Sequence, residues 1–212
     1  MGETVPPDQH FARVADHAAW LTSGRSRLAS ADLIWPRVEQ IFADMRAVNA
    51  CRRAMMHQAL EQHPNDPQAL ATAAAIAPPH QPIPLPVLME LKGFADSYLL
   101  MAGYAVENFL KAVRVKRLTR ERKPIRFKGP DRIPSGHKYV DLARIELGDI
   151  SDAERQLLDR LAVFVRWAGR YPVSKEPPTI EEGHWVGHAS NEKPLVDALC
   201  QRLIQKYESI VL

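Results

Sequence analysis

Two arginines one helical turn apart are the side chains best suited to chemistry on an anion. Arg166 and Arg170 stand at positions i and i+4 of a stretch with helical periodicity, so they share one side and can hold a single phosphate between them. Neither can act as a general base, because a guanidinium does not deprotonate in proteins. His137, directly after Gly136, is the candidate for acid–base transfer. Its alternative role is to cap or pack against the helix that carries Glu107.

A carboxylate, an amide and an ammonium interrupt an otherwise apolar stretch at residues 99–113. The apolar residues of this helical pattern cover most of its circumference, which is typical of a central helix. An unpaired carboxylate would be strongly destabilising there, or would protonate. We therefore predict that Glu107 is more than half buried and hydrogen-bonded to a basic side chain. The polar residues of the stretch are Glu107, Asn108 and Lys111, and the candidate partners of Glu107 are Lys111, His137, Arg166 and Arg170.

Two interpretations of this polar cluster are open. In the first, Glu107 and its partner form a buried salt bridge that fixes the register of packed helices. In the second, the cluster lines a polar pocket inside a helical bundle, with Tyr171 as a further supporting side chain. The first interpretation implies only a structural role, whereas the second implies a ligand.

The charge of the chain is concentrated in one segment. Between Lys111 and Lys138, eleven basic side chains stand against two acidic ones, a net charge of +9 in 28 residues, whereas the whole chain carries only +3. Such a segment is a candidate surface for nucleic acid or another anion, and a solvated helix end is the alternative, since cations are favoured at a helix C-terminus. The candidate nucleic-acid contacts are Arg117, Arg120, Arg122, Lys123, Arg126, Lys128 and Arg132.

Other classes of protein find little support in the residues. No run of about 18 apolar residues predicts a membrane helix, and the first residues lack the basic and apolar regions of a signal peptide. We therefore expect a cytoplasmic protein that does not contact membranes. Cys51 and Cys200 are too few for a disulfide framework, and we expect both thiols to be reduced and buried.

Neither a cofactor nor a metal is expected. The sequence has no glycine-rich phosphate loop, nucleophile elbow or paired-carboxylate signature. His184 and His188, with Glu181 and Glu182, have the spacing of metal ligands, but we expect them in a loop that contains glycine and has no nearby cysteine.

The elements that position these residues are expected to be helices, because helical periodicity dominates the sequence and no sustained alternation of strand type occurs. Glycine, proline and capping signals predict helices at about residues 8–23, from 30 or 36 to 62, 67–77, 87–122, 138–147, 151–169 and 194–211. Ser151 and Glu154 form a capping box, and Gly148 ends the helix before it. The proline-rich residues 78–86 are the best internal boundary. The expected fold is all-α: an N-terminal helical extension, residues 1–80, followed by a helical bundle, residues 86–212.

Four motifs together are similar to those of a known family. "LLMAGYAVENFLKA", "GHKYVDLARIEL", "ISDAERQLLDRL" and "RWAGRYP" resemble the HEPN superfamily, most closely its abortive-infection and related bacterial defence branches. The resemblance covers about residues 87–172, two-fifths of the chain. Residues 1–80 carry no resemblance that we can assign.

The resemblance implies an HEPN-like bundle of four to five helices, often dimeric, that binds RNA or a nucleotide. Many members are metal-independent endoribonucleases of toxin–antitoxin or phage-defence systems, so a second copy and a cognate antitoxin or defence partner are implied. In these enzymes an arginine stabilises phosphate charge, and a histidine four to six residues away transfers protons.

The chain departs from the family pattern at the catalytic pair. Arg166 and Arg170 stand at the matching place, where no histidine occurs, so the implied catalytic set is Arg166, Arg170 and His137. Two pairs elsewhere have the required spacing, Arg52 with His57 and Arg132 with His137, which is close to the number that chance supplies. The expectation is an RNA- or nucleotide-binding protein with a non-standard or degenerate ribonuclease site. The alternative is a catalytically silent helical interaction or oligomerisation protein whose polar cluster is structural.

Overall fold

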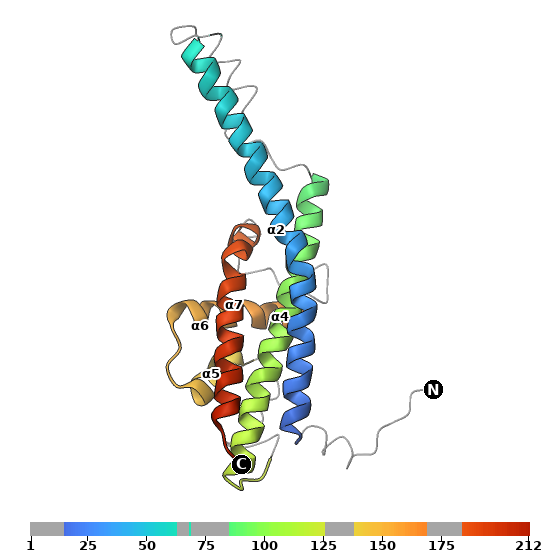
Figure 1. The fold of residues 1–212 in the computed structure, drawn as a ribbon, viewed down its shortest axis with the longest axis vertical. Helices are drawn as coiled ribbons and strands as arrows, with labels where there is room; N and C mark the ends of the chain where they lie inside the picture. The colour runs from blue at the N-terminus through green and yellow to red at the C-terminus, as the bar shows by residue number, and fades with distance from the viewer. Residues whose placement is uncertain (1–14, 63–67, 69–84, 126–137, 169–183) are drawn as a thin grey trace, which may run out of the picture. The chain divides into compact units, whose positions relative to one another are not determined.

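The computed structural model describes residues 15–62, 68, 85–125, 138–168 and 184–212, and every regular element in these ranges is helical (Figure 1). This confirms the predicted all-α class. None of these helices is long and apolar enough to cross a membrane. The elements are α2 (His17–Gln62), α4 (Leu85–Arg120), α5 (Tyr139–Leu147), α6 (Asp152–Val163), the π-helical segment η1 (Phe164–Ala168) and α7 (His184–Ser209).

The chain divides into two compact units. Met1–Ile34 and Ala95–Leu212 form the first unit, and Trp35–Phe94 forms the second. The sequence-based division, an extension at residues 1–80 and a bundle at residues 86–212, stays a prediction. In the structure the start of α2 belongs to the same unit as most of α4 and all of α5, α6 and α7.

The second unit contains the distal part of α2 and the start of α4. Its buried apolar side chains come from one stretch of α2 and from Leu91. Arg37 Nε donates a hydrogen bond of 3.0 Å to Glu90. Cys51 is exposed on α2, so the prediction that both thiols are buried is wrong for Cys51 and right for Cys200. The buried side chains of α2 in this unit are Trp35, Val38, Ile41 and Phe42.

Helix α4 is the central helix of the first unit. In Figure 1 its lower half lies between the start of α2 and α7, and its side chains contact both of those helices. Its apolar residues cover most of the circumference, as the sequence pattern predicts, and neighbouring helices bury them. The buried apolar residues of α4 in this unit are Ala95, Tyr98, Leu99, Ala102, Ala105, Val106, Phe109, Leu110, Ala112, Val113, Val115 and Leu118.

Helix α2 is continuous where two helices were expected. Gly24 and Pro36 were taken as signals that end one helix and begin the next, but both lie inside α2. A Cβ atom on Gly24 would lie 2.6 Å from the ring of Phe109, so the glycine allows α2 to approach α4 closely. Tertiary packing therefore explains this glycine, and it outweighs the low helix propensity of Gly.

The α5–α6 hairpin follows the local signals in the sequence. Helix α5 ends at Gly148, whose φ of 80° is readily adopted by glycine. Ser151 accepts a hydrogen bond from the backbone N–H of Glu154, and the Glu154 side chain accepts one from the Ser151 backbone, which confirms the capping box. The α-helix ends at Val163 and continues as η1 to Ala168, although the sequence predicted α-helix throughout.

Helix α7 begins at His184, ten residues before the predicted start. The predicted start, about Pro194, is a residue type that is favoured in the first turn of a helix, but Pro194 lies inside α7. Ion pairs hold the turn before this proline in place: Glu192 with Arg160 of α6, and Lys193 with Asp32 of α2 at 2.7 Å. The predicted loop is therefore helical from residue 184 onward, and this includes the backbone of His184 and His188.

Candidate nucleic-acid interface

Glu107 lies in a cluster of paired polar groups on α4. The residue is 8% exposed, and its Oε1 accepts a hydrogen bond of 2.6 Å from Lys111 Nζ. These two observations confirm the prediction that Glu107 is buried and bonded to a basic side chain. Its other oxygen, Oε2, accepts a hydrogen bond of 2.8 Å from the hydroxyl of Tyr139 at the start of α5. Both carboxylate oxygens are therefore occupied by groups of the protein.

Aromatic and amide side chains surround this pair. Lys111 Nζ lies 4.7 Å from the ring centroid of Trp20, a cation–π contact with the first turn of α2. Asn108 donates a hydrogen bond of 2.9 Å to the hydroxyl of Ser23. Burial and then the neighbouring Glu107 charge raise the pKa of Tyr139 far above its ordinary value. The hydroxyl therefore stays protonated and acts as a hydrogen-bond donor. The closed arrangement favours the structural interpretation of this cluster.

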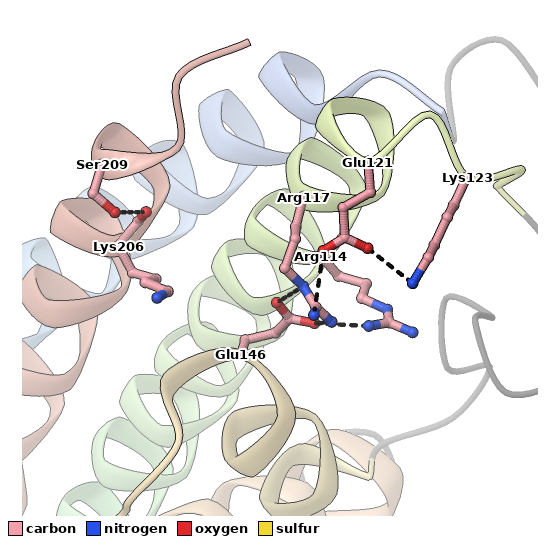
Figure 2. A network of polar contacts seen from close by, with 7 residues as sticks. All are labelled: Arg114, Arg117, Glu121, Lys123, Glu146, Lys206 and Ser209. Atoms are coloured by element: carbon pink, nitrogen blue, oxygen red, sulfur yellow. Dashed lines mark hydrogen bonds and ion pairs between the residues drawn. The ribbon is translucent and has the colours of Figure 1, made fainter.

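A second buried carboxylate joins α5 to α4 further along both helices. The side chain of Glu146 has no exposed surface. Arg114 Nη1 donates to its Oε1 at 3.2 Å, and Arg117 Nη2 donates to the same oxygen at 3.0 Å (Figure 2). Arg117 Nε lies 3.0 Å from Oε2, a contact that is an ion pair rather than an aligned hydrogen bond. Two of the basic residues of the charged segment thus have an internal structural partner.

Glu121 continues this network toward the surface. Its carboxylate lies 3.7 Å from Arg117 Nη1 and 3.0 Å from Lys123 Nζ. The hydrogen bond from Lys123 and the positive charges nearby lower the pKa of Glu121, so it remains ionised at neutral pH. Figure 2 shows Glu121 on the far side of Arg117 from Glu146.

Helix α4 ends in a Schellman motif with an arginine at its left-handed position. The backbone N–H of Lys123 donates to the carbonyl of Leu118 at 2.9 Å, and that of Arg122 donates to the carbonyl of Thr119 at 3.0 Å. Arg122 has φ of 53°, a value that glycine adopts most readily. It is the one residue other than glycine with positive φ in the ranges that the structure describes. Arg120 and Arg122 are exposed, and the Lys123 side chain is 48% exposed.

The predicted nucleic-acid contacts therefore fall into three groups. Arg117 is partly buried and supports the α4–α5 contact. Arg120, Arg122 and Lys123 form an exposed basic end of α4, which we name the α4 basic end. The remaining three candidates, Arg126, Lys128 and Arg132, lie outside the described residues.

The predicted catalytic set is described only in part. Arg166 lies in η1, is exposed, and donates a hydrogen bond of 3.2 Å from Nε to the carbonyl of Ala162. Its charge opposes the rise in the pKa of Tyr139. The described contacts of Glu107 are those with Lys111 and Tyr139. Arg170, His137 and Tyr171 lie outside the described residues.

Sequence reasoning missed Tyr139 and Glu146, although a signal for both exists. The buried face of α5 has positions i, i+3, i+4 and i+7, the spacing of an amphipathic helix. A carboxylate at the last of these positions indicates a buried group that needs cationic partners. The buried residues of α5 are Tyr139, Leu142, Ala143 and Glu146.

Comparisons with protein-family models, with curated proteins and with solved structures found no match to this chain.

Proposed function

We propose that this chain is an HEPN-like protein that binds RNA, or the phosphates of a nucleotide, through the α4 basic end. The observation that carries the proposal is the position of Arg122. This residue keeps a long cationic side chain at a left-handed position, which costs about 1–2 kcal/mol for a residue other than glycine. Backbone strain of this kind is often found where a side chain is needed for function.

The electrostatic arrangement supports the same proposal. Arg114 and Arg117 are held by Glu146, whereas Arg120 and Arg122 are exposed beyond them. These exposed guanidiniums lie at a helix C-terminus, where they also interact favourably with the helix dipole. A phosphodiester backbone would add several charge-assisted hydrogen bonds, which arginine forms better than lysine because its donors are planar and fixed.

We further propose that the site has a degenerate ribonuclease pair. Arg166 and Arg170 replace the arginine and histidine of the family pattern, and two guanidiniums bind phosphate without removing a proton from a ribose 2′-hydroxyl. Turnover is therefore expected to be very slow or absent unless His137 supplies the base. The resemblance also suggests a homodimer and a cognate antitoxin or defence partner.

The alternative function is that of a catalytically silent interaction or oligomerisation protein. The closed contacts of Glu107 favour it, because they leave no free carboxylate oxygen for a ligand. Exposed apolar side chains on α2 also favour it, since such groups mark interaction surfaces. Examples are Val48, Met55 and Met56.

The test is direct binding and cleavage of RNA by the full chain. We expect a labelled single-stranded RNA to show raised fluorescence anisotropy with the wild-type protein and to remain intact during incubation. Weak cleavage that disappears in both Arg170→Ala and His137→Ala would assign the remaining activity to these residues. Vigorous cleavage that depends on neither would place the active site elsewhere, and absence of binding at low salt would leave the interaction protein as the better account.

A further inference from the structure

The carboxylate of Glu121 lies between Arg117 and Lys123, and the second of these belongs to the α4 basic end. Its Oε1 is 3.7 Å from Arg117 Nη1, and its Oε2 is 3.0 Å from Lys123 Nζ. Figure 2 shows this carboxylate reaching one cation on α4 and one beyond the end of the helix. A phosphate group bound by an arginine and a lysine would use its oxygens in the same way.

Glu146 fixes the orientation of the Arg117 guanidinium, including its Nη1 atom. The Nε and Nη2 atoms of Arg117 face Glu146, each at 3.0 Å, and this leaves Nη1 directed toward Glu121. Because Glu146 is fully buried and also pairs with Arg114, the Arg117 guanidinium is held in place. The Arg117 side chain is nevertheless 30% exposed. Glu146 is therefore a positioning residue for this guanidinium.

We infer that Glu121 is an internal competitor that occupies a phosphate position between Arg117 and Lys123. The inference rests on the proposed function and specifies its ligand class. A single phosphate that displaces Glu121 gains little more than the ion pairs it breaks. A single-stranded RNA also contacts Arg120 and Arg122 and releases several counterions, so it can displace the carboxylate. The site therefore selects linked phosphates over free phosphate or a mononucleotide.

The experiment compares Glu121→Gln with Glu208→Gln. Glu208 is a suitable control because it is also exposed and paired with an arginine, Arg25 at 3.6 Å, in the same unit. Anisotropy of a short fluorescein-labelled single-stranded RNA is measured at several KCl concentrations. We expect Glu121→Gln to bind about two to five times more tightly at low salt, the range that one exposed ion pair supports.

Two further measurements distinguish competition by Glu121 for the phosphate position from a general effect of the charge change. The slope of log K against log salt should steepen by about 0.7 in Glu121→Gln, since one more phosphate is neutralised. Inorganic phosphate should weaken RNA binding more in Glu121→Gln than in the wild type. Circular dichroism and urea unfolding establish that both variants are folded.

The outcomes distinguish this inference from the proposed function. If RNA affinity changes equally in Glu121→Gln and Glu208→Gln, or changes in neither, the role of Glu121 is overturned. The proposed function still stands in that case, provided that the wild type binds RNA. If neither the wild type nor Glu121→Gln binds RNA at low salt, both fail. If only Glu121→Gln binds, the competition is stronger than expected and the inference is supported.

Discussion

The hydroxyl of Tyr139 donates a hydrogen bond of 2.8 Å to Oε2 of Glu107, which ties the first residue of α5 to the middle of α4. The last turn of α5 is tied to α4 by Glu146 and its two arginine partners. A helix of 9 residues is unstable alone, so α5 depends on these two polar anchors and on the apolar residues between them. The second anchor also orients the Arg117 side chain beside the α4 basic end.

Removing the Glu107 carboxylate should strongly destabilise the fold. Glu107→Ala removes the carboxylate that accepts hydrogen bonds from the ammonium of Lys111 and the hydroxyl of Tyr139, and the loss of one member of a buried pair costs about 3–5 kcal/mol. Tyr139→Phe should cost about 1.5–3 kcal/mol, because only one hydrogen bond to the carboxylate is lost. Urea unfolding measures both, with the exposed Asp159→Ala as a control expected within about 0.5 kcal/mol of wild type. A Glu107→Ala protein as stable as this control would contradict the account of the cluster.

Replacing either of two glycines in the long helices by alanine should change the free energy of unfolding, with opposite signs at the two positions. Gly24→Ala places a methyl group 2.6 Å from the Phe109 ring and should cost about 1–3 kcal/mol through overpacking. Gly93→Ala places one where, among the described atoms outside its own helix backbone and its two chain neighbours, none lies within 4 Å, so it should stabilise α4 by up to about 1 kcal/mol. Thermal or urea unfolding gives the sign of each change. Equal effects would show that α2 and α4 do not approach closely at Gly24.

Stability should fall as the pH drops below 6.5 because of His17. Burial, and then the charge of Lys116, lower the pKa of His17 below its ordinary value of 6.5, while Asp16 acts in the opposite direction. The unfolded chain therefore takes up the proton first, and protonation favours unfolding as pH falls from 6.5 toward the lower folded pKa. The hydroxyl of Tyr207 lies 2.7 Å from Nδ1, so the neutral ring can accept its hydrogen bond.

The measurement for His17 is the urea midpoint between pH 7.5 and pH 5.5, both within about one unit of the ordinary histidine pKa. His17→Gln serves as the reference, because it differs from the wild type only at residue 17. The wild type should lose more stability than the variant over this interval. The same loss in both proteins would assign the pH dependence to other groups.

Arg122→Gly should separate stability from binding. Glycine removes the cost of the left-handed backbone conformation at this position, but it also gives the unfolded chain more conformational freedom. The net result should be a free energy of unfolding that is higher by about 0.5–1 kcal/mol. The same change removes a cation from the α4 basic end and should weaken RNA binding. Arg122→Ala is the matched control, since it removes the cation but keeps the strain. Unchanged RNA affinity in both variants would exclude Arg122 from the interface.

Local signals in the sequence were sufficient for several elements. The ends of α4 and α5 and the capping box at Ser151 depend on residues within a turn of each other, so the sequence carried the necessary information. The burial of Glu107 also followed from its own helix, since that helix is apolar on nearly all sides.

Errors arose where distant contacts decide the outcome. Gly24 packs against Phe109, 85 positions further along the chain, and no local rule reveals that contact. Tyr139 and Glu107 are 32 residues apart, so their pairing depends on how α5 packs on α4. Pro194 lies inside α7, where Glu192 and Lys193 form ion pairs with other helices. In each case tertiary packing outweighs the local preference of a glycine or proline, or supplies a partner that spacing alone cannot identify.

The salt dependence of RNA binding tests the central proposal most directly. The double reversal Arg120→Glu with Arg122→Glu is compared with Arg46→Glu with Arg53→Glu, an equal charge change at exposed residues of α2. For single-stranded RNA, log K should fall with log salt with a slope of about −0.7 for each phosphate neutralised. We predict weaker binding and a shallower slope for the α4 pair, and affinity and slope close to wild type for the α2 pair. The same effect from both pairs, or no effect from the α4 pair, would contradict the proposal that the α4 basic end binds RNA.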